Sequence, residues 1–440
     1  MTRIVVVSPE CAPVSAYSGL SDYCRGLCRD ALLRGLEMEV LMPFYPGWEP
    51  GSGWSGDGEE DLWAPLGDGY VHCRVHRGRV QGMRFRLIEP QDPAGLFRAG
   101  RTPDGAAERA RFDFFARAAV RLLERGEWPD AVHFLGWETA LGAVLWTATP
   151  RLFSFFEAPP EGGDALVPAV QAATWVSTSS AHYAGACARG AGGRRLAQAL
   201  TARGEAFGGL RPALERPLWD PGHDPLVWRT FSANTLPRKA DDKAWLRRQL
   251  HLEQTRVPLV VGVGRGIARK RIDLVARALA QALDAGAQCV YLGVAVEAGA
   301  LAPLEALRGR PGFRLLERHD EGLAHGLFAA ADILVHPARP EPRGLAILAA
   351  LAYGAAPIVH RSGAGADLVT DVHDDEAPYA RRNGFLFDTD EDLAGALERA
   401  LYLWYEHPHH FRRLRVNAMA TDCAWDRPGE ILQRLYTAAP

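Results

Sequence analysis

The feature that most limits the fold of this 440-residue chain is a repeated alternation of short apolar runs with helical patterns. The first apolar run, 4–7, is followed by a glycine-containing loop, an amphipathic stretch through Leu33 and a second apolar run at Glu37–Met42. Such alternation is typical of parallel sheets with right-handed crossovers. A second series begins at Val257. We therefore predict an α/β protein with two Rossmann-like domains facing each other across a cleft, and ligands at the carboxyl ends of the strands.

A proline-rich, charged segment at Arg211–Asp224 separates the two series, and we interpret it as the crossing between the domains. The predicted divisions are a first domain over 1–214, a second over 215–418 and a C-terminal segment over 419–440. A helix is expected at Pro428–Tyr436 in that last segment.

Three local expectations concern the first domain. Residues 49–75 are rich in Gly, Trp and Asp, and we expect an irregular excursion there. Strand character resumes at Val80–Ile88, and the alanine-rich stretch Ala106–Arg125 predicts a helix.

Charge and cysteine content exclude several classes of protein. The formal net charge of -3 offers no general attraction to nucleic acid or to an anionic membrane. No apolar run reaches the ~18 residues that a membrane-spanning helix needs. The seven cysteines are an odd number without a C-x-x-C pair, which argues against a disulfide framework or a zinc site and favours a reducing cytoplasm.

Four spaced segments of the second half resemble motifs of the bacterial glycogen and starch synthases. Gly264–Leu274 resembles S-R-L-x-x-Q-K-G-x-D-L, and His336–Leu345 resembles P-S-R-F-E-P-C-G-L. Pro357–Asp367 resembles P-I-V-R-R-T-G-G-L-A-D, and Asn383–Phe387 resembles x-G-F-L-F. Because several motifs occur in the right order, the resemblance is more specific than any single glycine-rich turn.

The resemblance extends over nearly the whole chain, through Val5–Pro13, Ala16–Leu20, Ala107–Phe115 and Trp219–Pro225. It implies a GT-B fold and a retaining, metal-independent glycosyltransferase. It also implies an acceptor domain in the first half, a nucleotide-donor domain in the second, and a C-terminal helix that packs back on the first domain.

By this resemblance, Arg265 and Lys270 contact the donor phosphates. Breaking a sugar–diphosphate bond needs fixed positive charge around an anionic leaving group. Glu341 is expected to bond donor hydroxyls and to stabilise developing positive charge, with a simple helix-capping acid as the alternative. Phe328 is expected either to stack near the base or to be a core aromatic residue. The donor-binding candidates are Gly19, Gly344, Leu345, Ser362, Gly363 and Phe328.

The first half departs from the family pattern on the acceptor side. The family's K-T-G-G-L motif falls on 16–20, where Ala16 replaces the lysine. Its H-x-H-D-W-H falls on 133–138, where Gly136 replaces the aspartate and Glu138 the last histidine. Its T-I-H-N falls on 154–157, where Phe156 replaces the histidine. The acceptor-side candidates are Glu138, Glu157, His133 and Phe156. Glu138 and Glu157 suit an amine acceptor, or they are solvated loop residues.

Three functions remain open. The favoured hypothesis is a pseudo-glycosyltransferase of acarbose-type biosynthesis that joins a nucleotide-activated unsaturated cyclitol of the valienol type to an amino-sugar oligosaccharide through a C–N bond. The alternatives are an α-1,4-glucan synthase that uses ADP- or UDP-glucose, and a non-catalytic homologue that binds nucleotide sugars. No tightly bound cofactor is expected, only the nucleoside diphosphate of the donor, with GDP or ADP as the guess. The expected partners are a nucleotide-activated sugar or cyclitol and an oligosaccharide or amino-sugar acceptor, without nucleic acid or membrane.

Overall fold

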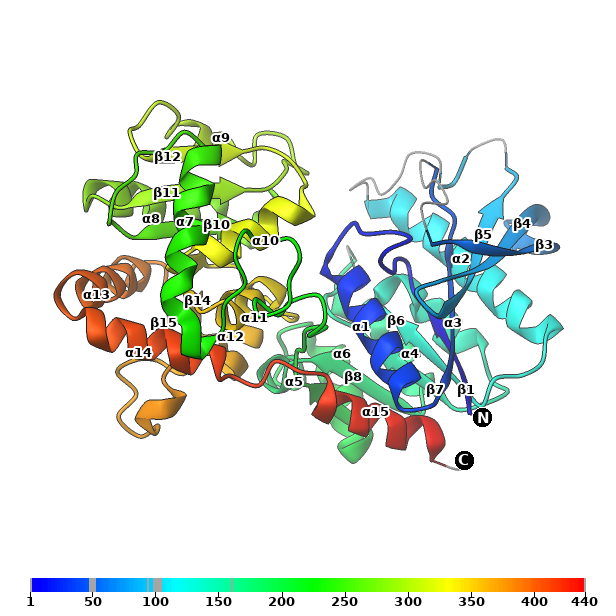
Figure 1. The fold of residues 1–440 in the computed structure, drawn as a ribbon. Coiled ribbons are helices and arrows are strands. Elements are labelled where there is room, and N and C mark those ends of the chain that lie inside the picture. Colours follow the sequence, from blue (N-terminus) through cyan, green and yellow to red (C-terminus); the bar gives the residue numbers. More distant parts are fainter. Residues whose placement is uncertain (1, 47–52, 93–94, 98–104, 160, 439–440) are drawn as a thin grey trace. The chain divides into compact units, whose positions relative to one another are not determined.

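The chain forms two compact units in this computed structural model (Figure 1). The structure describes residues 2–46, 53–92, 95–97, 105–159 and 161–438. Unit 1 combines Met1–Ala213 with Trp425–Pro440, and unit 2 is Leu214–Ala424. Each unit has its own hydrophobic core around a sheet. Among the residues that the structure describes, no helix is both long and apolar enough to cross a membrane.

Unit 1 is built on a nine-stranded sheet in the order β3-β4-β5-β2-β1-β6-β7-β8-β9. All neighbouring strands from β5 to β9 run parallel, whereas β3 and β4 add an antiparallel edge. Its strands are β1 (Arg3–Val7), β2 (Glu37–Pro43), β3 (Ser55–Leu66), β4 (Gly69–Val80), β5 (Met83–Pro90), β6 (Ala131–Leu135), β7 (Arg151–Ser154), β8 (Trp175–Ser179) and β9 (Phe207–Leu210). Its α-helices are α1 (Gly19–Leu33), α2 (Gly105–Arg125), α3 (Ala140–Leu145), α4 (Val167–Ala172), α5 (Ala181–Ala188), α6 (Arg194–Ala202) and α15 (Asp426–Thr437). Apart from the partly exposed Arg3, the strands β1 and β6 are buried on both faces, and their residues other than Arg3 and His133 are apolar.

The antiparallel edge corrects two of the local expectations. The prediction of an irregular excursion was wrong for 55–75, where β3 and β4 form a hairpin; residues 49–52 lie outside the described part of the chain. The single strand expected at Val80–Ile88 is interrupted by a turn at Gln81 and Gly82, which both have positive φ. The outward-facing side of the hairpin carries cross-strand ion pairs such as Asp61–His72. These polar residues hid the alternation that marks a strand.

The C-terminal helix α15 packs closely on α1. A Cβ atom on Gly26 of α1 would lie closer than 3.0 Å to the indole of Trp425, and one on Gly429 would do the same to Asp30. The Arg34 guanidinium also donates a hydrogen bond to the Asp426 carbonyl at 2.8 Å. Glycine on each helix is therefore what permits the close approach.

Unit 2 is an all-parallel sheet in the order β12-β11-β10-β13-β14-β15. Its strands are β10 (Leu259–Val263), β11 (Gln288–Leu292), β12 (Phe313–Leu316), β13 (Ile333–His336), β14 (Ala356–His360) and β15 (Phe385–Phe387). Its α-helices are α7 (Lys239–Gln249), α8 (Ile272–Asp284), α9 (Ala302–Glu305), α10 (Glu321–Ala330), α11 (Leu345–Ala352), α12 (Ala364–Leu368), α13 (Asp392–Glu406) and α14 (Pro408–Met419). The strand order reverses between β10 and β13, and such a switch point is where α/β sheets bind ligands.

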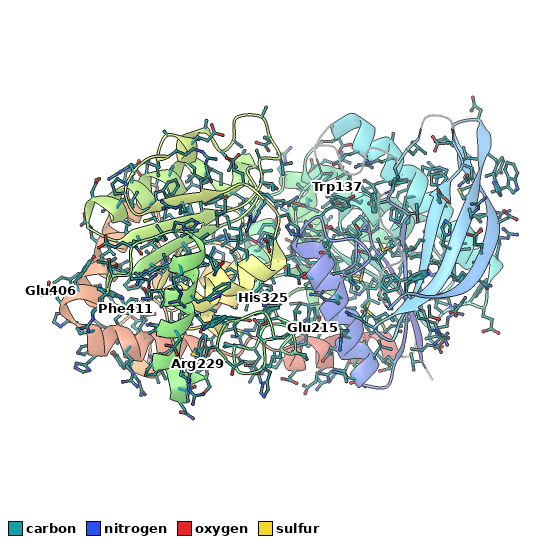
Figure 2. The ribbon with its side chains drawn as sticks, turned by 45° about the horizontal axis from the view of Figure 1, so that its top comes forward. Trp137, Glu215, Arg229, His325, Glu406 and Phe411 are labelled. Carbon is teal, nitrogen blue, oxygen red and sulfur yellow. The ribbon has the colours of Figure 1, made fainter. Side chains whose placement is uncertain are left out.

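Buried polar contacts fix the helices of unit 2 behind this switch point. The Lys239 ammonium donates hydrogen bonds to the carbonyls of Phe328 at 2.6 Å and Tyr353 at 2.7 Å, near the C-terminal ends of α10 and α11. Asp224 accepts hydrogen bonds from His325 at 2.7 Å and from the Tyr353 hydroxyl. Figure 2 labels His325 within the unit. These contacts attach the segment before α7 to the same two helices.

Candidate functional site

The loop after β10 places two basic residues at the switch point of unit 2. The amide of Gly264 donates to the Leu292 carbonyl at 3.0 Å, and its own carbonyl accepts from the Tyr291 hydroxyl at 2.8 Å. The loop ends at Arg271, which has a φ of 50° and directly precedes α8. This fixed loop carries Arg265 and Lys270, both half-buried.

Lys270 meets residues from the next strand of the sheet. Its ammonium donates a hydrogen bond to Glu341 Oε2, and His336 Nε2 lies 3.2 Å from the same oxygen. His336 is the last residue of β13, and Glu341 belongs to the loop between β13 and α11. The three side chains are thus one charged cluster assembled from the carboxyl ends of β10 and β13.

The cluster keeps Glu341 ionised. Burial alone would raise the pKa of this carboxyl group, but the Lys270 charge and the His336 contact hold it well below its ordinary value. Burial and the neighbouring Lys270 lower the pKa of His336, so its imidazole is neutral at pH 7. The site therefore presents one ammonium and one carboxylate, and the neutral imidazole of His336 lies beside the carboxylate.

Two glycines hold the Glu341 loop in place. Gly344, with φ of 62°, donates its amide hydrogen to Glu341 Oε1 at 3.2 Å and precedes the first turn of α11. A Cβ atom on Gly363, whose φ is 53°, would lie closer than 3.0 Å to the Glu341 carbonyl oxygen. The Ala364 amide donates to that same carbonyl at 2.8 Å. Glu341 is consequently fixed through its side chain and its backbone.

Ser362 belongs to a neighbouring network after β14. Its hydroxyl lies 2.8 Å from His360 Nδ1, and His360 Nε2 lies 3.0 Å from the Asp388 carbonyl. Asp390 forms ion pairs of 2.7 Å with both Arg271 and Arg339. These contacts join the loops that follow β14 and β15 to the loop of Lys270.

The structure therefore brings together Lys270, Glu341, Gly344 and Gly363, with Leu345 opening α11 beside them. Phe328 is not part of this cluster. It is 2% exposed and packs edge-on against Trp219, with ring centroids 5.9 Å apart, as expected for a core aromatic residue. Sequence reasoning missed His336, although it opens one of the motifs. A histidine ending a buried strand was the signal that could have found it.

In unit 1, the loop before α1 is held by a carboxylate that sequence reasoning also missed. Glu10 Oε2 accepts hydrogen bonds from the amides of Tyr17 and Ser18, both at 2.8 Å. Ser18 in turn caps α1 by accepting from the Leu20 amide at 3.1 Å. Gly19 is the first residue of α1, beside this network. Glu10 lies in the Val5–Pro13 motif, so its place after a buried strand was the available signal.

His133 and Phe156 are core residues of unit 1. His133 is 0% exposed, with Nδ1 2.6 Å from the Tyr436 hydroxyl and Nε2 2.7 Å from the Ser154 hydroxyl. Burial lowers the pKa of His133 to about 3. Phe156, 1% exposed, packs edge-on against Tyr23 at 4.8 Å. Both side chains therefore stabilise the packing around α1 and α15.

The two acceptor-side glutamates follow neighbouring strands. Glu138 lies just after β6 in a 3-10 turn with Trp137, which Figure 2 labels, and it is 4% exposed. Trp137 packs edge-on against Phe112 at 5.9 Å. Glu157 lies after β7 and is half-buried. The structure thus places both glutamates at the carboxyl ends of parallel strands.

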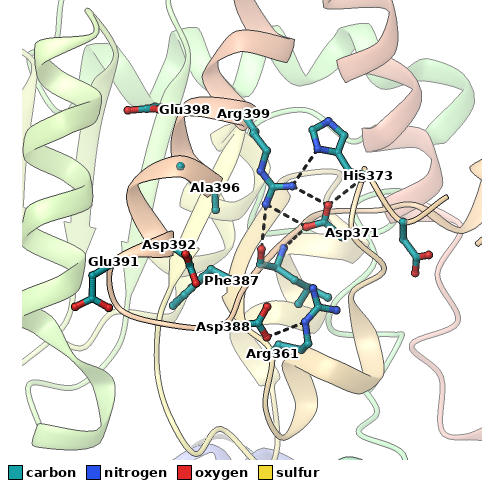
Figure 3. A pocket seen from close by; sticks show the side chains of 13 residues that line it. Arg361, Asp371, His373, Phe387, Asp388, Glu391, Asp392, Ala396, Glu398 and Arg399 are labelled. Atoms are coloured by element: carbon teal, nitrogen blue, oxygen red, sulfur yellow. Dashed lines mark hydrogen bonds and ion pairs between the residues drawn. The ribbon is translucent and has the colours of Figure 1, made fainter. Parts of the chain in front are cut away.

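A polar groove of about 960 Å³ lies at the outer edge of the sheet of unit 2, beyond β15. Figure 3 shows Arg399 paired with Asp371 at 2.9 Å, and Arg361 paired with Asp388 at 2.9 Å. Because these charges satisfy one another, the groove resembles a structural ion-pair network more than a binding site. Among the described residues, no group of three or more His, Cys, Asp or Glu side chains could hold a metal ion.

The chain is similar to known protein families and to individual proteins over most of its length. The starch synthase catalytic domain matches residues 3–160, and the glycosyl transferases group 1 family matches residues 244–415. Glycogen synthase 2 of Methylococcus capsulatus is 31% identical over 98% of each chain. Glycogen synthase 1 of Nitrosococcus oceani is 29% identical over the same shares.

Solved structures agree. The catalytic domain of starch synthase IV from Arabidopsis thaliana, bound to ADP and acarbose, superposes with a TM-score of 0.91 at 26% identity, over 99% of this chain and 98% of that one. WaaG, a glycosyltransferase of lipopolysaccharide biosynthesis, superposes with a TM-score of 0.61 at 13% identity, over 99% of this chain and 100% of that one. These likenesses confirm the GT-B fold.

Proposed function

Because the chain belongs to the glycogen and starch synthase family of glycosyltransferases, we propose that it transfers a hexosyl unit from an ADP-type nucleotide sugar to the end of an α-glucan, with retention at the sugar carbon. This choice places the glucan-synthase alternative ahead of C–N coupling. The relatives named glycogen synthase match the chain from end to end, which supports it.

The observation that carries the proposal is the cluster of Lys270, Glu341 and His336 at the switch point of unit 2. When the bond between the sugar carbon and the diphosphate oxygen breaks, negative charge develops on the leaving phosphate. Lys270 and Arg265 would stabilise that charge electrostatically. The Glu341 carboxylate would bond donor hydroxyls and oppose the positive charge on the sugar ring. The acceptor hydroxyl forms the new bond to the sugar carbon, and its proton passes to the oxygen of the leaving diphosphate.

Adenine is the base that we propose for the donor. The structure of starch synthase IV from Arabidopsis thaliana, 26% identical, is described as bound to ADP and acarbose. That description supports ADP over GDP and an oligosaccharide of the maltose type as acceptor. All seven cysteines are buried, and their odd number without a C-x-x-C pair supports the proposal of a reducing cytoplasm.

C–N coupling to an amino sugar is the second candidate, and one observation favours it. Phe156, in the position of the family's histidine, is buried against Tyr23 and offers no polar group to a reacting sugar. A nucleotide-activated cyclitol would use the same donor residues, and an amine would replace the acceptor hydroxyl. The non-catalytic homologue is the third possibility.

The deciding experiment offers ADP-, UDP- and GDP-glucose with a malto-oligosaccharide or an amino-sugar oligosaccharide, and identifies products by mass spectrometry. The proposal expects extension by one hexose with ADP-glucose, lost in Lys270→Ala and retained in Arg277→Ala, an exposed residue of α8. No extension by a protein that still binds ADP would reject it and direct the search to cyclitol donors with amine acceptors. No nucleotide binding at all would favour the non-catalytic homologue.

A further inference from the structure

Gly136 directly follows strand β6 of unit 1, in a conformation held by hydrogen bonds. Its φ is 85°, its amide donates to the Ser154 carbonyl at 2.8 Å, and its carbonyl accepts from the Thr139 hydroxyl at 3.0 Å. Strand order reverses between β1 and β6, so the loops after these two strands border the switch point of this sheet. Gly136 therefore lies where a parallel sheet ordinarily binds its ligand.

The carboxylate of Glu138 fills the space above Gly136. A Cβ atom built on Gly136 would lie closer than 3.0 Å to Glu138 Oε2, and 3.4 Å from both the Glu138 carboxyl carbon and Leu20 Cδ2. Leu20 belongs to the first turn of α1. The carboxylate of Glu138, two residues later in the chain, thus occupies the space that a side chain at position 136 would need.

This geometry gives meaning to two of the departures from the family pattern. In the motif on 133–138 the family has aspartate where this chain has Gly136, and histidine where it has Glu138. The pair of changes keeps one carboxylate within this motif and removes an imidazole, and the Glu138 carboxylate occupies the space that a side chain at position 136 would need.

We propose that Glu138 supplies the acceptor-side carboxylate of this protein, from a position that only glycine at 136 leaves open. The carboxylate accepts a hydrogen bond from the nucleophilic O–H or N–H group of the acceptor and orients it. This inference rests on the proposed function, since it names a positioning residue and the group it binds. Gly136 acts through Glu138 by leaving its volume free.

The proposal predicts that a carboxylate at position 136 can replace the one at position 138. Glu138→Ala is expected to lower kcat/KM for the acceptor at least tenfold and to leave the Kd for ADP unchanged. The double variant Gly136→Asp with Glu138→Ala is expected to be several-fold more active than Gly136→Ala with Glu138→Ala, which carries the same backbone strain at φ of 85°, because the new carboxylate enters the vacated volume. Glu138→Gln, which keeps the shape without the charge, is expected to behave like Glu138→Ala at the acceptor.

A second comparison tests the contact itself. Gly136→Ala is made in the wild-type and in the Glu138→Ala background, so that the backbone strain at φ of 85° is common to both. Gly35→Ala is the matched control, since Gly35 has φ of 81° and no atom within 4 Å of an added Cβ. We expect Gly136→Ala to reduce acceptor kcat/KM strongly in the wild-type background and little in the other.

Two results would overturn the proposal. One is a folded Gly136→Asp/Glu138→Ala protein, with wild-type ADP affinity, that transfers no better than Gly136→Ala/Glu138→Ala. The other is an equal effect of Gly136→Ala in both backgrounds. Failure of the proposed function is distinguishable, since it appears as no hexosyl transfer by the wild-type protein. In that case the wild-type protein, Gly136→Ala, Glu138→Ala and the double variant are compared by melting temperature. An equal loss of melting temperature from Gly136→Ala in both backgrounds would show that the two positions do not interact, and would overturn the proposal.

Discussion

Lys270 and Glu341 are 71 positions apart in the chain, yet the ammonium of one donates a hydrogen bond to the carboxylate of the other. The parallel sheet of unit 2 creates this pair, because the loops after β10 and β13 leave the same edge of neighbouring strands. The pair is partly shielded from water, so its two charges depend on each other. Most of the expected behaviour of the donor site follows from that dependence.

Removing the ammonium should therefore affect activity and stability separately. Lys270→Met is expected to lower kcat at least 10²-fold, about 2.7 kcal/mol of lost transition-state stabilisation, and to destabilise the fold because Glu341 is left uncompensated. Lys270→Met combined with Glu341→Gln should regain stability without regaining activity. Thermal melts and initial rates on the same samples check this. A double variant no more stable than Lys270→Met would mean that the charge pair does not govern stability.

The same carboxylate predicts how stability depends on pH. Lys270 and His336 hold the pKa of Glu341 well below its ordinary 4.5, so the unfolded chain binds this proton more readily than the folded chain does. The contribution is complete above about pH 4.5 and is lost as pH falls toward the lower folded-state pKa. Denaturant unfolding of wild-type and Glu341→Gln proteins should show a stability difference that shrinks below that pH. A constant difference would contradict the assignment.

His133 predicts a dependence in a different range. Burial lowers its pKa to about 3, so the folded protein keeps the imidazole neutral while the unfolded chain takes up a proton below about pH 6.5. Stability should thus fall by up to about 1.4 kcal/mol per pH unit as pH decreases from 6.5 toward 3. His133→Gln should make this slope less steep, whatever its effect at pH 8, and the remainder should include the contribution of His336, whose pKa is also lowered by burial. An unchanged slope would place the proton uptake elsewhere.

The packing of α15 on α1 depends on the absence of a side chain at Gly26. A methyl group there would overlap the Trp425 indole, so Gly26→Ala should cost about 1–3 kcal/mol of unfolding free energy. Gly395→Ala is the control: it is also helical, with open space around its Cβ, and should stabilise by up to about 1 kcal/mol. Chemical denaturation measures both. A neutral Gly26→Ala would mean that α15 shifts freely on α1.

The prediction from sequence succeeded where structure depends on short segments. The helix expected at Ala106–Arg125 is α2, and the helix expected at Pro428–Tyr436 lies within α15. The hairpin of β3 and β4 was missed because a strand with one charged face has few apolar residues. Its existence depends on the cross-strand partner, which no local pattern contains.

The sequence by itself determined the α/β class and the family, because these follow from local periodicity and from ordered motifs. Only the tertiary structure decided which of those residues meet. It placed His336 on Glu341, Phe328 in the core and the Glu138 carboxylate in the volume above Gly136. The physical reason is that hydrogen bonds and excluded volume act over a few ångströms, between groups that the chain brings together only when the sheets have formed.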